Sequence, residues 1–127
     1  LLSRRQRQMC IRDRLYALLL QTYTILGETS KRESQLVAIQ KMLPAVRAEQ
    51  SRALLLVTLY GCTDSRLYYD QAHALIDPWL AEKSPKKSKA QLIRHLADFD
   101  RQFGHGGEGG MDSRSEQAVF GLRISNK

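Results

Sequence analysis

The sequence has few cysteines, few prolines and no long apolar run, and each shortage excludes a class of protein. Two cysteines in 127 residues do not support a disulfide scaffold. The longest apolar stretches, residues 15–20 and residues 53–60 with one threonine inside, are much shorter than the roughly 20 residues that cross a bilayer. Three prolines and eight glycines are too few for a collagen-like chain. The hydrophobic fraction of 43% and the charged fraction of 26% are typical of one globular domain.

The first residues form an arginine-rich segment of unusual composition. Residues 3–14 read SRRQRQMCIRDR, which closely resembles the translation of a sequencing-adapter read. The chain begins with Leu1 rather than methionine, so we expect a fragment whose native upstream sequence is missing. A segment of this kind is left out of fold reasoning. We expect its removal up to Arg14 to change the stability of the domain little.

More than half of the net positive charge lies in that segment. The chain carries 20 Lys and Arg against 13 Asp and Glu, a net charge of +7, of which residues 3–14 contribute +4 and the rest +3. The charge therefore argues only weakly for a nucleic acid or an anionic membrane as partner. Outside the segment only Cys62 remains, which indicates the cytoplasm and a small buried side chain.

Caps and helix breakers predict about five helices. We expect the first helix to cover residues 15–26 and to end at Gly27. Ser30 followed by Glu33 is the pattern of a capping box at the start of the second helix. Pro44 predicts a break near residue 43 or the first turn of a third helix, which covers residues 47–60 and stops near Gly61.

The second half of the chain continues in the same way. Asp64-Ser65 predicts the start of a helix over residues 66–76, and Asp77-Pro78 predicts a bend or a restarted turn. Ser84-Pro85 is the pattern of an N-cap before the last helix. That helix is expected to end at Gly104. Its amphipathic stripe consists of Leu92, Leu96, Phe99 and Phe103.

An internal repeat organises these helices. A shift of 36 residues places Ala17 to Leu20 over Ala53 to Leu56, Thr22 over Thr58 and Gln35 over Gln71. A period in the thirties is typical of stacked helical hairpins. Over residues 15–80 the layout resembles tetratricopeptide-like repeats in period rather than in residue motif. The resemblance implies an α-helical stack with a concave surface that binds a partner.

These patterns predict an all-α fold of stacked antiparallel helical hairpins with a flexible C-terminal tail. We divide the chain into a segment that is not native at residues 1–14, a helical-repeat-like domain at residues 15–104, and a linker and disordered tail at residues 105–127. The glycine-rich residues 104–110 lack the Gly-Lys-Ser/Thr ending of a phosphate-binding loop and favour a linker. Phe120, Leu122 and Ile124 alternate in the tail, which is also the pattern of a short strand.

Three aromatic residues are candidates for partner binding. Tyr68, Tyr69 and Trp79 lie in the second repeat, and tyrosine and tryptophan are frequent anchors of binding surfaces. The alternative is that they fill the core where the repeats meet the last helix.

A lysine cluster is the candidate for nucleic-acid binding. Residues 83–89 contain Lys83, Lys86, Lys87 and Lys89, which can contact phosphates, whereas the alternative is an exposed linker. No aromatic residue lies between the lysines, so a groove that stacks bases is not indicated.

A third group has metal-ligand residue types. Asp70, His73 and Asp77 have the spacing of one helix face, where they can hold a metal ion or form only a local His–Asp hydrogen bond. His95 and Asp98 fit surface neighbours better than a catalytic pair. We expect no metal, no cofactor and no enzymatic activity.

Two functions follow. The first is a small interaction module that binds a peptide or a partner helix. We expect it not to bind a membrane. The alternative is a helical nucleic-acid-binding protein that uses residues 83–89. The oligomeric state stays open.

Overall fold

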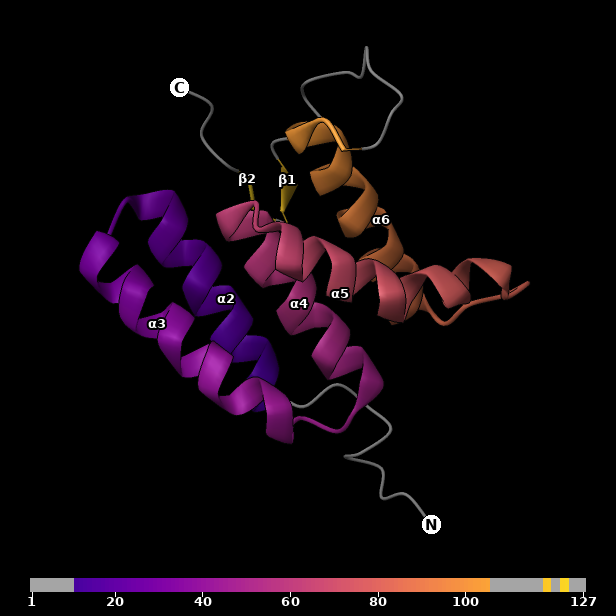
Figure 1. Cartoon of the computed structure of the whole chain (residues 1–127), viewed down its shortest axis with the longest axis horizontal. Helices are drawn as coiled ribbons and strands as arrows, with labels where there is room; N and C mark the ends of the chain where they lie inside the picture. The colour runs from indigo at the N-terminus through magenta and orange to yellow at the C-terminus, as the bar shows by residue number, and fades with distance from the viewer. Residues whose placement is uncertain (1–10, 106–117, 120–121, 124–127) are drawn as a thin grey trace.

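The computed structural model describes residues 11–105 and two short strands at residues 118–119 and 122–123. Residues 11–105 form an all-α domain (Figure 1). Its α-helices are α2 (Ile11–Leu26), α3 (Thr29–Met42), α4 (Glu49–Thr63), α5 (Arg66–Ile76) and α6 (Lys87–Phe103). The 3-10 helix η1 (Leu43–Ala45) follows α3, and η2 (Asp77–Ala81) follows α5. The predicted fold class and the five helices are confirmed for this part of the chain.

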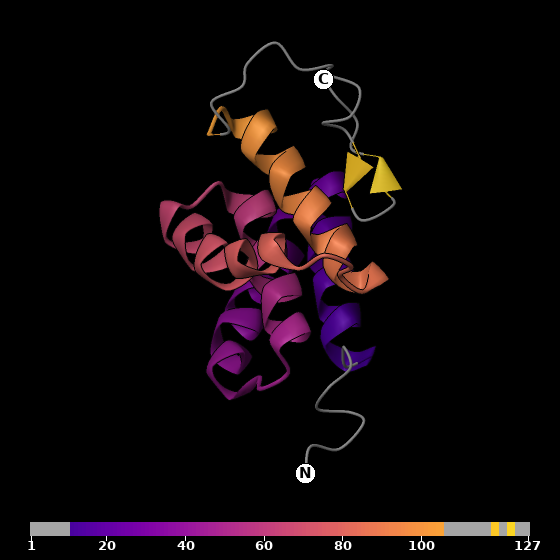
Figure 2. The same cartoon turned by 90° about the vertical axis from the view of Figure 1, so that its right-hand side faces the viewer.

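Helix α4 is the centre of the domain. It forms a hairpin with α5, and it packs against α2 on one side and α6 on the other, while α2 forms a hairpin with α3 (Figures 1 and 2). Every residue of α4 from Ala53 to Tyr60 is buried. This stretch is apolar on all sides apart from Thr58, as expected for a helix with neighbours all round.

The C-terminal tail is described only at its two strands. β1 (Ala118–Val119) and β2 (Leu122–Arg123) pair in antiparallel fashion, with Val119 opposite Leu122. The alternation at Leu122 therefore does coincide with a strand. The glycine-rich run after His105 and the other tail residues lie outside the described residues, as do residues 1–10.

The glycines and prolines end the helices where the sequence predicts, with one exception. Gly27 and Gly104 have φ angles of +75° and +80°, a conformation in which glycine has no steric penalty. Pro44 and Pro78 lie in the first turns of η1 and η2. Gly61, however, does not end α4, which continues to Thr63. A Cβ atom at Gly61 would lie 2.2 Å from the ring of Phe99, so this glycine lets α6 approach α4.

Four predicted helix starts are wrong by a few residues, and one of them is that of α4, which begins at Glu49 rather than at residue 47. Ser30 lies inside α3, because the turn after Gly27 leaves only Glu28 before the helix. Helix α6 begins at Lys87 rather than after Ser84, since Lys86 still has an extended backbone with a ψ angle of 155°. Helix α2 begins at Ile11, because nothing between this residue and Leu15 breaks a helix.

The early start of α2 brings residues 11–14 of the adapter-like segment into the helix. Asp13 is buried, with 3% of its surface exposed, and it lies in the first helical turn. A truncation of residues 1–10 leaves α2 whole, whereas a truncation up to Arg14 removes its first turn.

None of the described helices is both long enough and apolar enough to cross a bilayer.

Candidate functional site

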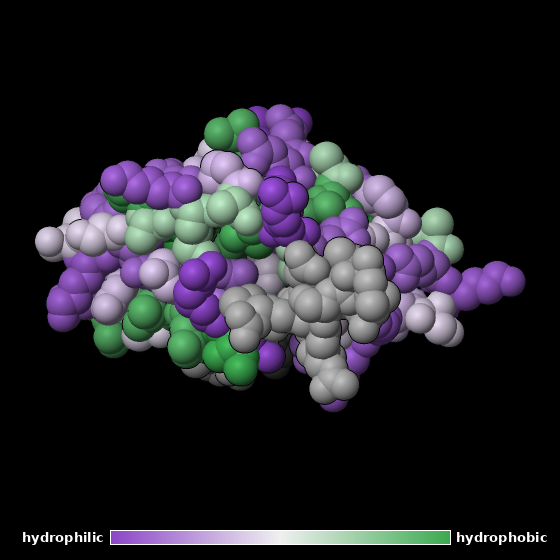
Figure 3. Space-filling view, turned by 90° about the horizontal axis from the view of Figure 1, so that it is seen from below, coloured by the Kyte–Doolittle hydropathy of each residue, from purple (hydrophilic) through white to green (hydrophobic). Residues whose placement is uncertain are grey.

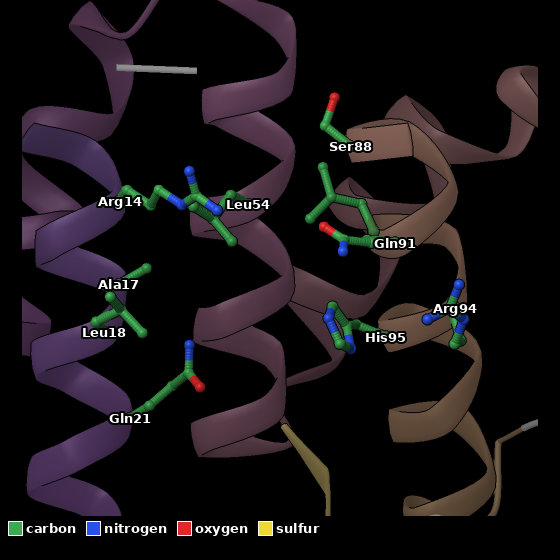
Figure 4. Close-up of a pocket in the computed structure, with 10 residues that line it drawn as sticks. Arg14, Ala17, Leu18, Gln21, Leu54, Ser88, Gln91, Arg94 and His95 are labelled. Atoms are coloured by element: carbon green, nitrogen blue, oxygen red, sulfur yellow. The ribbon is translucent and has the colours of Figure 1, made fainter. Parts of the chain in front are cut away.

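A groove with a volume of about 380 Å³ runs between α2 and α6, with α4 as its floor (Figure 4). Its apolar part combines Ala17 and Leu18 from α2 with Leu54 from α4 and Leu92 from α6. Figure 4 shows polar side chains directed into the space above α4 from both walls. These polar lining residues are Arg14 and Gln21 on α2 and Ser88, Gln91, Arg94 and His95 on α6. We call this site the α2–α6 groove.

Gln21 is the most unusual residue of the groove. Only 2% of its surface is exposed, and neither Nε2 nor Oε1 has a hydrogen-bond partner among the described residues. A buried polar group without a partner costs about 1–3 kcal/mol, so such groups are rare in folded domains. The structure therefore contains a donor and an acceptor that are shielded from solvent and available to a bound molecule.

Replacement of this amide is expected to stabilise the free protein. Gln21→Met keeps the length of the side chain and removes both unpaired groups, so we expect the free energy of unfolding to rise by about 1–2 kcal/mol. Urea unfolding followed by circular dichroism measures the change. Gln91→Met is the control, because Gln91 is exposed and its amide is solvated, and it should change stability by less than about 0.5 kcal/mol. A loss of stability in Gln21→Met would contradict the conclusion that the Gln21 amide has no hydrogen-bond partner in the folded protein.

The groove is cationic and otherwise neutral. None of its ten lining residues is an aspartate or a glutamate. Within residues 11–105, no carboxylate lies within salt-bridge distance of Arg14 or Arg94. Burial, with the charge of Arg94 as a smaller cause, lowers the pKa of His95 to about 4, so its ring is neutral at pH 7. An anionic occupant therefore meets no repulsion from the lining.

An exposed apolar surface on α2 adjoins the groove. Ile11, Leu15, Leu18 and Leu19 follow one another at helical spacing, with exposed fractions of 76%, 53%, 36% and 41%. Figure 3 shows hydrophobic side chains gathered on the α2–α3 side of the molecule. We call these four residues the α2 face. It meets the groove at Leu18, which belongs to both.

The three aromatic residues predicted to bind a partner have separate surroundings. Trp79 is buried, with 3% exposed, and Lys89 Nζ lies 5.0 Å from the centre of its ring. Tyr68 is half-buried, and its hydroxyl accepts a hydrogen bond of 2.7 Å from Gln40 Nε2. Tyr69 is also half-buried, and its ring packs on His73 at 4.5 Å. None of the three lines the α2–α6 groove.

The lysines lie around the start of α6. Lys83, Lys86 and Lys87 are exposed. Lys89 is not, because its ammonium group forms an ion pair of 2.9 Å with Glu82 and 19% of its side chain is exposed. Three of the four predicted lysines therefore point toward solvent.

The three residues with metal-ligand side chains, Asp70, His73 and Asp77, do not all contact one another. Asp70 pairs with Arg66 at 3.4 Å, away from His73. His73 lies between two carboxylates, with Nδ1 at 2.8 Å from Asp77 Oδ1 and Nε2 at 2.8 Å from Asp100 Oδ2. No group of three or more potential metal ligands is found among the described residues. The His–Asp hydrogen bond, the alternative to the metal site, is present.

Asp100 is the residue that the sequence analysis missed in this region. It is buried on α6 and accepts a hydrogen bond of 2.7 Å from the hydroxyl of Tyr60 on α4, in addition to its contact with His73 on α5. The carboxylate therefore joins three helices. Its position one residue after Phe99 in the amphipathic stripe gives no sign of this.

His73 gives the domain a pH-dependent contact. Partial burial opposes the charged ring, but the hydrogen bonds and charges of Asp77 and Asp100 outweigh it and raise the pKa of His73. Protonated His73 therefore stabilises the fold at acidic pH, and this contribution is lost as the pH rises through the raised pKa.

We expect the stability difference between the wild type and His73→Gln to shrink as the pH rises from about 5.5 to about 8. Urea unfolding at several pH values tests this, and the comparison of the two proteins cancels the contributions that they share. A difference that grows with pH would contradict the expectation.

The remaining predicted groups are at the surface or in the core. Asp98 pairs with Arg101 on the same helix. Cys62 is a free thiol that packs against the core, and burial raises its pKa, which makes it unreactive at neutral pH.

Comparison with known proteins finds no matching family model, no matching curated protein and no matching solved structure.

Proposed function

We propose that this chain is a protein-interaction module that binds a partner helix along the α2 face, with side chains of that helix in the α2–α6 groove. The observation that carries the proposal is the comparison of α2 with α4. After the 36-residue shift, the exposed Leu15, Leu18 and Leu19 correspond to α4 positions that are almost fully buried. These positions are Ser51 at 0%, Leu54 at 6% and Leu55 at 0%.

The corresponding residues differ in exposure because α2 and α4 have different neighbouring helices. Helix α4 packs against α2, α5 and α6, whereas α2 packs against α3 and α4 and keeps its four-residue face exposed (Figures 1 and 2). In a stack of helical hairpins each apolar face is covered by the next helix. A helix from a partner would cover the α2 face as neighbouring helices cover α4. This supports a repeat of the tetratricopeptide-like type and a partner that continues the stack.

In helix-in-groove recognition, the bound helix contacts an apolar surface through side chains spaced three and four residues apart. The α2 face offers such an apolar surface, and the adjoining groove can hold some of these side chains. The single described cysteine, Cys62, is free. This supports the cytoplasm as the proposed compartment.

The test is binding of helical peptides to surface variants. A displayed library of amphipathic helical peptides is selected on the wild type, and the selected peptides are titrated by fluorescence anisotropy. The double variant Leu15→Ser/Leu19→Ser removes exposed apolar contacts from the α2 face, so we expect its affinity to fall at least about tenfold, which corresponds to about 1.4 kcal/mol.

The matched control is Val37→Ser/Leu67→Ser. These residues are equally exposed, at 47% and 57%, but they lie on α3 and α5. Equal losses in both double variants, or no selected helix at all, would overturn the proposed function.

Nucleic-acid binding is the second candidate, and one observation favours it. Lys83, Lys86 and Lys87 are exposed at the start of α6, close in sequence to Ser88 of the groove. A phosphate contact releases counterions, so affinity for an oligonucleotide would fall steeply with salt. Replacement of these three lysines by glutamine should flatten the salt dependence. If the wild type does not bind single-stranded or duplex oligonucleotides at low salt, the candidate is eliminated.

A further inference from the structure

The α2–α6 groove indicates which kind of helix it accepts, and this inference rests on the function proposed above. Gln21 offers an unpaired N–H donor and an unpaired C=O acceptor, and Figure 4 shows its side chain directed from α2 into the groove. An occupant without a matching polar group leaves the cost of the two unpaired amide groups in place. A suitable occupant therefore supplies an acceptor and a donor at the same place.

In a helical occupant only side chains can meet this requirement. The backbone N–H and C=O groups of a helix are already bonded to each other, except at its ends. The side-chain carboxamide of asparagine or glutamine carries one C=O and one NH₂, so it can form two hydrogen bonds with Gln21. Around it, Leu18, Leu54 and Leu92 offer contacts to apolar side chains.

The charge of the groove selects among such helices. Arg14 and Arg94 lie on opposite walls, and the lining contains no acidic residue. Two copies of this chain would bring the same cations together across a symmetric interface, which is unfavourable. A helix with aspartate or glutamate along its edge instead meets two guanidinium groups that form no salt bridge within residues 11–105. Arg94 lies outside the adapter-like segment, so the argument does not depend on Arg14.

We infer that the occupant is an amphipathic helix of another protein, with one asparagine or glutamine among its apolar residues and acidic residues along its edge. The carboxamide pairs with Gln21 in the shielded part of the groove. The acidic side chains face the arginine on α6.

Comparative selection tests this inference. A displayed library of helices of about 18 residues, roughly five turns, has fixed leucines on one face and random residues at one central and two edge positions. It is selected in parallel on the wild type, Gln21→Met, Arg94→Glu and the control Gln102→Met, at an exposed residue of α6 that does not line the groove. On the wild type we expect asparagine or glutamine at the central position and aspartate or glutamate at the edge.

Each variant should change one preference only. Gln21→Met should remove the carboxamide preference, and Arg94→Glu should replace the acidic preference by a basic one. Gln102→Met should change neither, because Gln102 is exposed and lies outside the groove lining. In titrations, exchange of the central glutamine of a selected peptide for methionine should weaken binding to the wild type about tenfold. The same exchange should leave binding to Gln21→Met unchanged.

The outcomes separate this inference from the proposed function. If helices are selected without a carboxamide or acidic preference, the inference is wrong and the proposed function stands. If no helix is selected, both are wrong. If sedimentation of the wild type shows a dimer that Gln21→Met abolishes, the occupant is a second copy of this chain and the inference is overturned. Unchanged circular dichroism of each variant shows that the fold is kept.

Discussion

Leu96→Ala is expected to lower the free energy of unfolding by about 2–5 kcal/mol, because it leaves a cavity in the core. Leu96 is 3% exposed in the middle of α6, the helix that packs on α4 and η2. Total domain stability is only about 5–15 kcal/mol, so the variant should melt well below the wild type. Urea unfolding followed by circular dichroism measures the loss.

Leu80→Ala is the control for this substitution. Leu80 lies in η2 with 62% of its surface exposed, so its truncation should change stability by less than about 0.5 kcal/mol. If Leu96→Ala melts within a degree of the wild type, α6 does not pack on the rest of the domain.

The same residue shows why most of the fold can be predicted from the sequence. Leu92, Leu96 and Phe99 recur at spacings of four and three, and all three are at most 3% exposed. Periodicity of this kind reports which side of a helix is buried, and Gly27 and Gly104 report where helices end. The information is local in the sequence, so the pattern alone is sufficient.

The errors at helix ends have an equally local cause. A capping pattern such as that of Ser30 and Glu33 describes a possible N-cap but not the path by which the chain reaches it. The preceding turn at Gly27 brings the chain into α3 two residues earlier. Gly61 does not end α4 as the sequence predicts. Its small size instead leaves room for the ring of Phe99, a residue 38 positions away.

The candidate site could not be predicted from the sequence because its parts come from three helices. Gln21 interrupts an apolar stretch and reads as a surface residue of α2. Only the packing of α2 and α6 on either side of Leu54 buries it. The aromatic residues and lysines were selected by residue type, which is a property of each residue, whereas a groove is a property of the packed helices.

Asp100→Ala is expected to destabilise the domain by about 3–5 kcal/mol, because it removes a buried charge that holds two partners. The hydroxyl of Tyr60 would lose its acceptor at 2.7 Å, and His73 would lose one of its two carboxylates. Tyr60→Phe removes only the first of these contacts, so it should cost less, about 1–2 kcal/mol. Asp98→Ala is the control on the same helix and should cost no more than about 1 kcal/mol, because the ion pair of Asp98 with Arg101 lies within α6. Urea unfolding at pH 6 measures all three variants. If Asp100→Ala and Asp98→Ala lose the same amount of stability, Asp100 does not join α4, α5 and α6.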